Sequence, residues 1–135
     1  MADSNKIVVL VCGGRAYKDD EYLFERLEEF LAPRLVGCLI HGGATGADSL
    51  AGTFAKRKGW PVNIYYADWV KDGRAAGPKR NARMLKEGKP DLIIGFPTYG
   101  DENKGTKHML EIGRKAGVEV IEVEPRARAT ARANF

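Results

Sequence analysis

The sequence predicts a single α/β domain, in which a doubly wound, mostly parallel sheet of about five strands is covered by helices on both faces. Short apolar, β-branched runs alternate along the 135-residue chain with segments whose apolar residues recur at helical spacing. Glycine-rich turns follow several of these runs, as expected where a buried parallel strand leads into a helix. A chain of this length can form one core without disulfides or metals.

The elements alternate in chain order. The predicted strands span residues 6–12, 36–41, 61–67, 91–96 and 118–123, the last alternating as an edge strand would. The predicted helices span residues 21–31, 49–58, 79–87 and 105–116, with a long loop over 68–78. The expected caps and stops are Asp19 or Asp20, Gly59, Pro78 and Gly117.

Composition is that of an ordinary globular protein, with 30% charged and 44% apolar residues. No apolar run approaches the roughly 18 residues of a membrane span, and residues 1–5 lack a signal-peptide pattern. We therefore expect a cytoplasmic protein with no membrane partner. Cys12 and Cys38 are expected to be free buried thiols on neighbouring strands, with a redox pair as the alternative.

The net charge of +4 is concentrated at the C-terminal end. Arg126, Arg128 and Arg132 lie in the last ten positions with no acid among them, and without them the net charge falls to +1. A nearly neutral body gives no general argument for nucleic-acid binding. We expect residues 1–124 to form the domain and residues 125–135 a flexible basic tail, with contact to nucleic acid or an acidic partner as the alternative.

The stretch HGGATGAD, residues 41–48, joins the second predicted strand to a helix. Its glycines let backbone approach a ligand, and the helix start directs free N–H groups and positive dipole toward that ligand. Phosphate is the usual occupant of such a place. The alternative needs no ligand, because Thr45 and Asp48 fit a capping box in a tight joint.

Other loops at the same sheet edge have a similar composition. Gly13, Gly14 and Arg15 end the first strand, where the guanidinium either suits a phosphate or is simply solvated. Trp69 either stacks on a base or covers the loop that carries it.

Two further loops add to this set. Arg80 and Asn81 are expected in the first turn of the third helix, and Gly105 with Thr106 forms a second glycine-led helix start. Parallel strands bring these loops to one edge, where α/β folds bind their ligands. This convergence is the sequence argument for a binding site.

The motifs, in this order on these elements, resemble the YspA-like branch of the SLOG superfamily over about residues 6–123. The resemblance implies a Rossmann-like fold that binds a nucleotide or nucleotide-derived phosphate ligand. Its relatives include LOG phosphoribohydrolases, which suggest a homodimer, DprA DNA-processing proteins and nucleotide sensors. The motifs are Gly13-Gly14-Arg15, residues 41–48, Ala67-Asp68-Trp69, Gly77-Pro78-Lys79-Arg80-Asn81 with Met84, and Gly105-Thr106.

The resemblance implies two phosphate loops, the second at Gly105 and Thr106. Arg80 stands where LOG enzymes have a catalytic arginine. The LOG glutamate four residues after Gly105 is replaced by Met109, and the loop over 97–104 is longer, so the LOG reaction cannot be transferred residue by residue. The first phosphate loop consists of Gly42, Gly43, Thr45, Gly46 and Asp48.

Three functions fit these observations. The first is a binding domain that holds a nucleotide at the two helix starts and needs no cofactor. The second is an N-glycosidic or phosphoester hydrolase of a nucleoside phosphate, with Arg80 steadying the phosphate and Asp48, Asp101 or Glu102 supplying a carboxylate. The third is a DprA-like module that binds DNA through basic residues. Its affinity for DNA would fall as the salt concentration rises. Those residues are Lys79, Arg80, Arg83, Arg126, Arg128 and Arg132.

The sequence predicts no metal site, because His41 and His108 lack ligand spacing. It leaves open the base of the ligand, the reaction and the oligomeric state. The complete predicted binding set is Gly13, Gly14, Arg15, Gly42, Gly43, Thr45, Gly46, Asp48, Trp69, Arg80, Asn81, Gly105 and Thr106.

Overall fold

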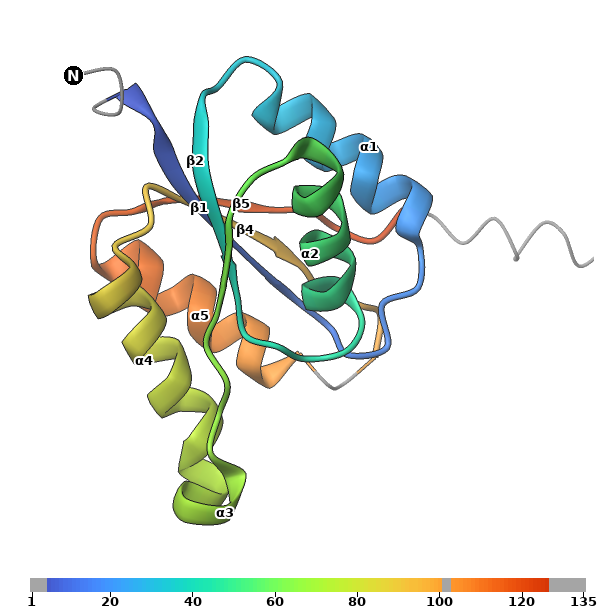
Figure 1. The fold of residues 1–135 in the computed structure, drawn as a ribbon. Helices are drawn as coiled ribbons and strands as arrows, with labels where there is room; N and C mark the ends of the chain where they lie inside the picture. The colour runs from blue at the N-terminus through green and yellow to red at the C-terminus, as the bar shows by residue number, and fades with distance from the viewer. Residues whose placement is uncertain (1–4, 101–102, 127–135) are drawn as a thin grey trace, which may run out of the picture.

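The computed structural model describes residues 5–100 and 103–126, which form a five-stranded parallel sheet between two layers of helices (Figure 1). The predicted α/β, Rossmann-like fold is therefore confirmed, and every strand pair is parallel. The strands, in the order β3-β2-β1-β4-β5 across the sheet, are β1 (Ile7–Gly13), β2 (Val36–His41), β3 (Val62–Ile64), β4 (Leu92–Phe96) and β5 (Glu119–Glu122). The helices are α1 (Asp20–Leu31), α2 (Ala47–Lys58), α3 (Trp69–Asp72), α4 (Ala76–Gly88) and α5 (Lys104–Lys115), with the 3-10 turn η2 (Gly73–Ala75).

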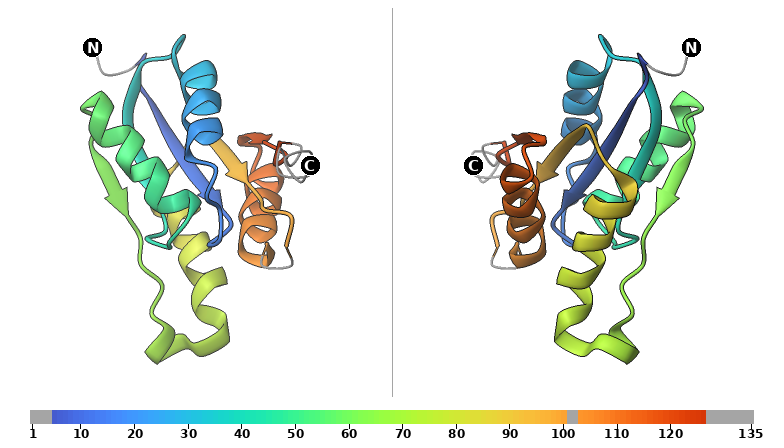
Figure 2. Two further views of the ribbon diagram at one scale, coloured as in Figure 1. Left: turned by 90° about the vertical axis from the view of Figure 1, so that its right-hand side faces the viewer. Right: turned by 90° about the vertical axis from the view of Figure 1, so that its left-hand side faces the viewer.

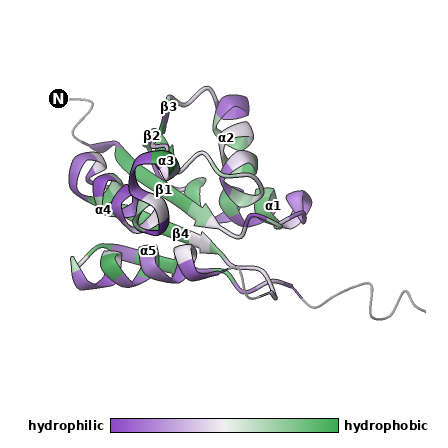
Figure 3. Ribbon diagram, turned by 90° about the horizontal axis from the view of Figure 1, so that it is seen from below, coloured by the Kyte–Doolittle hydropathy of each residue, from purple (hydrophilic) through white to green (hydrophobic). Residues whose placement is uncertain are grey.

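Side chains of β1 alternate between two cores, because successive residues of a strand point to opposite faces. Val9 and Val11 pack with α1 and α2, whereas Leu10 and Cys12 pack with α4 and α5. Figure 3 shows the apolar residues on the strands and on the helix surfaces turned toward them. Burial on both faces explains why β1 is a continuous apolar run in the sequence.

The strand order creates one switch point, between β1 and β4. The chain moves outward from β1 through β2 to β3, then crosses back to β4 and ends at β5. The connections after β1 and β4 therefore diverge at the carboxyl ends of these two strands. Ligands of open α/β sheets bind in the crevice at such a point.

The third strand is shorter than predicted. Only Val62–Ile64 pairs with β2, whereas the sequence suggested residues 61–67. The backbone amide of Tyr65 still donates to the carbonyl of His41 at 2.9 Å, after which the chain leaves the sheet. Ile64 and Tyr66 are exposed, so this apolar run at a sheet edge is not the buried strand that its composition indicated.

The predicted loop over residues 68–78 is wrong, because most of it is helical. Asp68 caps α3 by accepting the amide of Lys71 at 3.0 Å, η2 follows, and α4 begins at Ala76. Arg80 and Asn81 consequently lie in the second turn of α4 rather than in its first. Figure 2 shows α3 and the start of α4 extending well beyond the sheet.

The two cysteines are free thiols. Val8 on β1 is aligned with Cys38 on β2, so Cys12 lies four residues further along its strand. That offset corresponds to roughly 13 Å, whereas a disulfide requires Cα atoms within about 7 Å. The redox-pair alternative is therefore excluded by register in this fold, and only Cys12 is fully buried.

The chain after β5 contacts the N-terminal end of α1. Arg126 forms two hydrogen bonds of 2.7 Å with the carboxylate of Asp19, the residue that caps α1. The hydroxyl of Tyr99 donates to the carbonyl oxygens of Pro125 and Arg126 at 3.1 and 2.9 Å. The predicted basic tail thus begins with residues that contact the domain, while its arginines Arg128 and Arg132 lie outside the described residues.

Candidate functional site

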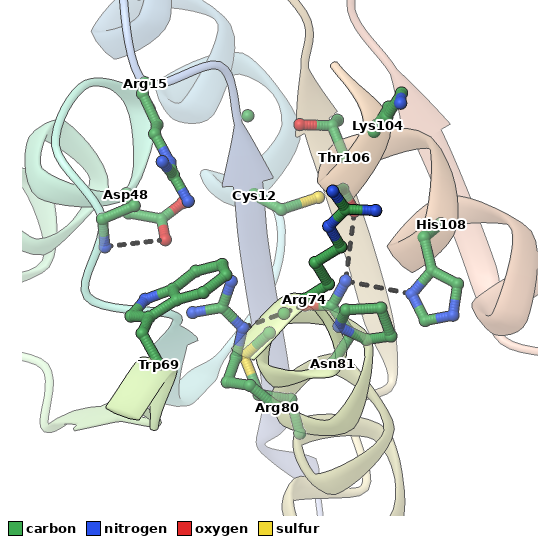
Figure 4. A pocket seen from close by; sticks show the side chains of 16 residues that line it. Cys12, Arg15, Asp48, Trp69, Arg74, Arg80, Asn81, Lys104, Thr106 and His108 are labelled. Atoms are coloured by element: carbon green, nitrogen blue, oxygen red, sulfur yellow. Dashed lines mark hydrogen bonds between the residues drawn. The ribbon is translucent and has the colours of Figure 1, made fainter. Parts of the chain in front are cut away.

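A cavity of about 440 Å³ opens at the carboxyl ends of β1 and β4, at the switch point of the sheet (Figure 4). Its walls come from the end of β1, the start of α2, the α3–η2 arm, α4 and the start of α5. The size falls in the range of roughly 300–1,000 Å³ that is usual for small-molecule sites. The lining residues are Cys12, Gly13, Arg15, Ala44, Asp48, Trp69, Arg74, Gly77, Pro78, Arg80, Asn81, Met84, Lys104, Gly105, Thr106 and His108.

The residues predicted for binding divide into two groups. Those that line the cavity are Gly13, Arg15, Asp48, Trp69, Arg80, Asn81, Gly105 and Thr106. Those that do not line it are Gly14, Gly42, Gly43, Thr45 and Gly46. Of the predicted catalytic residues, Arg80 and Asp48 share this cavity, and Glu102 lies outside the described residues.

Packing explains why several residues that do not line the cavity are glycine. A Cβ on Gly42 would stand 2.3 Å from the Arg80 guanidinium, and one on Gly46 would stand 2.3 Å from the carbonyl oxygen of Gly14. Gly43 and Gly46 also have positive φ angles of 75° and 77°, which other residues rarely adopt. These glycines are required by the joint between β2 and α2, whether or not a ligand binds.

The predicted capping box at the start of α2 does not form. Gly46 is the N-cap and has no side chain to accept a hydrogen bond, while Thr45 donates its hydroxyl to the carbonyl of Arg15 at 3.2 Å. The carboxylate of Asp48 turns back and accepts the amides of Gly42 at 3.0 Å and Ala44 at 3.3 Å. Asp48 therefore closes the preceding loop and leaves the first turn of α2 without a side-chain cap.

Asp48 is an unusual carboxyl group in this wall. It is only 5% exposed, and burial raises its pKa to about 6. The amide of Ala44, the guanidinium of Arg80 and the amide of Gly42 act in the opposite direction, since each favours the charged form. The residue can thus change its charge within the range of pH near neutrality.

Arg80 projects from α4 against the loop that follows β2. Its Nη1 donates to the carbonyl oxygens of Gly42 at 2.5 Å and Tyr65 at 3.4 Å, and its Nε donates to Asn81 Oδ1 at 3.0 Å. Burial lowers its pKa, and Asp48 opposes this shift. These contacts fix the guanidinium as a cation in the cavity wall.

Asn81 joins α4 to α5. Its Nδ2 lies 3.1 Å from both the carbonyl oxygen of Gly105 and Nδ1 of His108, while its Oδ1 faces the Arg80 donor. Because the carbonyl can only accept and the guanidinium can only donate, the orientation of this amide is determined. Because Asn81 Nδ2 can only donate, Nδ1 of His108 is the acceptor in this contact.

The start of α5 also lacks a side-chain cap within the described part of the chain. Asn103, at the N-cap position, bonds instead to the amide and carbonyl of Thr98 and to the carbonyl of Gly100. Thr106 is only 4% exposed, and it lines the cavity beside Gly105. An ideal Cβ on Gly105 would meet no atom within 4 Å.

The mouth of the cavity carries an aromatic ring and a cation. Trp69 is 50% exposed, and the guanidinium carbon of Arg15 lies 5.3 Å from the centre of its ring. Figure 4 shows Trp69 across the cavity from Lys104 and Thr106. The lining contains four basic side chains and one carboxyl group, so the cavity favours an anion. The basic residues are Arg15, Arg74, Arg80 and Lys104, and the carboxyl group is that of Asp48.

Several lining residues were missed by sequence reasoning. Lys104 directly precedes the predicted Gly105-Thr106 start and could have been identified from that position. His108 follows one helical turn after Lys104, but from the sequence it was considered only as a metal ligand. The position of Arg74 in the cavity depends on the turn η2, which the sequence did not predict. Cys12 points into the cavity from the end of β1, and burial raises the pKa of its thiol, which disfavours thiolate chemistry there.

The remaining candidate residues have structural partners. His41 is 5% exposed, and its Nδ1 accepts the amide of Gly43 at 3.0 Å; burial and Arg80 lower its pKa. Met109 is fully buried in the core between α5 and the sheet. The position where LOG enzymes have a glutamate is therefore part of the apolar core. Within residues 5–100 and 103–126, no three His, Cys, Asp or Glu side chains are grouped to bind a metal ion.

Two comparisons with known proteins show the family of this chain. The family model described as the YspA, cpYpsA-related SLOG family matches residues 7–71, which include β1, the glycine-rich joint before α2 and Trp69. The gene 61 protein of Mycobacterium phage D29 is 34% identical over 119 residues, covering 84% of this chain and 93% of the phage protein. No helix among the described residues is long and apolar enough to cross a membrane. The chain belongs to the YspA, cpYpsA-related SLOG family.

Proposed function

We propose that this cavity binds a nucleotide or nucleotide-derived ligand through its phosphate, in keeping with the nucleotide-related role of SLOG proteins. The observation that carries the proposal is the start of α5. Its first turn brings Thr106, the open space beside Gly105 and the cation of Lys104 together in the cavity lining. Amide donors and positive helix dipole at such a start stabilise a phosphate.

The opposite wall supports the same ligand class. The start of α2 is a second helix terminus without a side-chain cap, and Ala44 and Asp48 from this region line the cavity together with Gly105 and Thr106. Arg15, with its exposed guanidinium, lies near this second terminus. A ligand with more than one anionic group would find donors on both sides of the cavity.

The test is a binding panel measured by thermal shift and calorimetry. Inorganic phosphate, AMP, ADP, ADP-ribose and cyclic AMP are compared with adenosine, which carries no charge. We expect at least one phosphorylated compound to raise the melting temperature, while adenosine does not. No stabilisation by any phosphorylated member of the panel would contradict the proposal.

A matched pair of lysine variants locates the binding site on α5. Lys104 lines the cavity, whereas Lys107, one turn along the same helix, does not. We expect Lys104→Ala to weaken binding of the phosphorylated compound about 10-fold, the usual loss for a charge-assisted hydrogen bond. Lys107→Ala should have little effect, and equal losses in both variants would point to a nonspecific charge effect.

A second candidate function is hydrolysis of a nucleoside phosphate, and one observation favours it. Asp48 is a buried carboxyl in the cavity wall with a pKa near 6, which suits a general acid or base. Its Oδ2 already accepts two amides, so Asn can replace Asp without removing the acceptor.

The two candidate functions respond differently to Asp48→Asn. For a binding site alone, removing this negative charge should leave or improve the affinity for a phosphorylated compound. For a hydrolase, the same change should abolish release of the free base or phosphate from nucleoside monophosphates, measured by chromatography. Absence of release by the unmodified protein would remove the hydrolase candidate.

The DNA-binding hypothesis gains no support from the arrangement of its basic residues. Arg126 is paired with Asp19 beside α1, whereas Lys79 pairs with Asp72 and Arg80 faces the cavity on the other side of the sheet. Arg128 and Arg132 lie outside the described residues. We therefore place nucleic-acid binding behind the two small-molecule functions.

A further inference from the structure

Trp69 lies at the mouth of the cavity on α3, a short helix that packs beside α4. The four-residue helix α3 begins at Trp69 and is capped by Asp68, whose carboxylate accepts the amide of Lys71 at 3.0 Å. An ion pair of 3.1 Å between Asp72 and Lys79 ties the end of α3 to α4. These contacts connect α3 to α4 beyond the carboxyl edge of the sheet (Figure 2), and Figure 4 shows Trp69 beside the cavity.

The Trp69 ring belongs to neither hydrophobic core. It remains 50% exposed and is absent from both core clusters. A Cβ added at Gly77 of α4 would stand 3.5 Å from the ring, an ordinary van der Waals distance, so the ring is not tightly packed against α4. Its neighbour Val70 is 99% exposed and does not line the cavity. Of these two adjacent apolar residues, only the flat aromatic one is turned toward the site.

Arg15 lies over the Trp69 ring, and its charge also acts on the nearby carboxyl group of Asp48. Its guanidinium carbon is 5.3 Å from the ring centre, and its side chain has no hydrogen-bond acceptor among the described residues. Cation–π contacts at exposed sites are weak. A planar group can therefore enter next to the Trp69 ring at little cost, with the Arg15 guanidinium covering its other side or moving to a phosphate.

We propose that Trp69 is the base-stacking residue of this cavity and that Arg15 covers the stacked base, so the ligand is selected for its aromatic base as well as its phosphate. This inference depends on the proposed function, because the phosphate at α5 places the remainder of the ligand across the cavity toward Trp69 (Figure 4). Base stacking on one aromatic side chain changes affinity by about 10- to 100-fold.

The test compares AMP and GMP with ribose 5-phosphate, which has the same sugar and phosphate but no base. By calorimetry on the unmodified protein, we expect both nucleotides to bind about 10- to 100-fold more tightly than ribose 5-phosphate. Trp69→Leu should reduce the affinity for AMP and GMP to that for ribose 5-phosphate and leave the latter unchanged. Val70→Ser, on the same helix, is the control and should alter neither.

Fluorescence provides a second measurement. The other tryptophan, Trp60, packs edge-on against Phe54 at 5.8 Å between ring centres. Trp60→Phe therefore keeps an aromatic ring there and leaves Trp69 as the single tryptophan, whose emission is excited selectively at a wavelength that tyrosine does not absorb. AMP should quench this emission and ribose 5-phosphate should not. Equal binding of all three compounds, an equal loss for all three in Trp69→Leu, or binding of AMP without quenching would overturn the inference. Failure of all three to bind would instead refute the proposed function, and the stacking role with it.

Discussion

The two helix starts beside the cavity both contain glycine, but the glycines serve different purposes. At the start of α2, Gly42 and Gly46 leave no room for a Cβ, because Arg80 and the backbone of Gly14 occupy that space. At the start of α5, Gly105 is the second helical residue and faces open space, so no neighbouring atom requires a glycine there. The first set is explained by the fold alone, whereas the second requires another explanation, and an approaching ligand provides one.

The largest expected effect on stability is at Gly46, before α2. Gly46→Ala places a Cβ 2.3 Å from a carbonyl oxygen at a φ of 77°, so both steric overlap and backbone strain oppose folding. We expect the free energy of unfolding to fall by about 3 kcal/mol or more, measured by urea denaturation. A loss below about 0.5 kcal/mol would show that the joint before α2 relaxes easily and would remove the contrast between the two starts.

Asp48→Asn should produce an intermediate effect that depends on pH. The folded-state pKa of about 6 exceeds the ordinary value of about 3.9, so folding favours the protonated form. This stabilisation is complete below about pH 4 and is lost as the pH rises through about 6. Asparagine stays neutral, so the variant should match the unmodified protein near pH 4 and be more stable by about 1–3 kcal/mol at pH 7.5.

The measurement for Asp48→Asn is urea denaturation at several pH values from 4 to 8. Parallel stability curves for the two proteins would contradict the assignment of the raised pKa to Asp48. A second outcome is that Asp48→Asn is more stable at pH 7.5 and also binds AMP more tightly than the unmodified protein. That pair of results would show that the carboxylate opposes both folding and binding, and that the cavity retains it for another purpose.

The smallest expected change in stability is at Gly105. Because a Cβ there meets no neighbour, Gly105→Ala should raise the free energy of unfolding by about 0.5–1 kcal/mol through the better helix propensity of alanine. Binding of AMP should weaken at the same time, since the methyl group enters the space that the phosphate would use. Unchanged affinity would show that the open space beside α5 is not part of a binding site.

Much of the fold could be predicted from the sequence because its signals are local. Buried parallel strands such as β1, β2 and β4 are continuous apolar runs, and Asp19 caps α1 as an acidic residue before a helix should. The arm over residues 68–78 was missed because its short helices have few apolar residues at helical spacing; tertiary contacts with α4 hold it instead. The error moved Arg80 and Asn81 by one helical turn.

The site was only partly predictable for a related reason. The sequence showed which residues follow the strands, and the common sheet edge then brought Arg15, Asp48 and Thr106 to one cavity. It could not show that Asp48 turns back to bind the amides of Gly42 and Ala44 rather than capping α2, because both arrangements have the same spacing. The sequence also could not show which glycines are needed for close packing and which leave open space. That distinction depends on the atoms that surround each glycine in the folded protein.

The cavity walls join stretches of chain from Cys12 to His108, and these meet only when the sheet is complete. A small molecule held by both walls would therefore act as a removable cross-link across most of the polypeptide. Its effect should reach amides far from the cavity, including those of central β1 and β4, whose hydrogen exchange in the folded state requires global opening. Protection that increases throughout the sheet on addition of a compound would thus identify occupancy without any assay of chemistry.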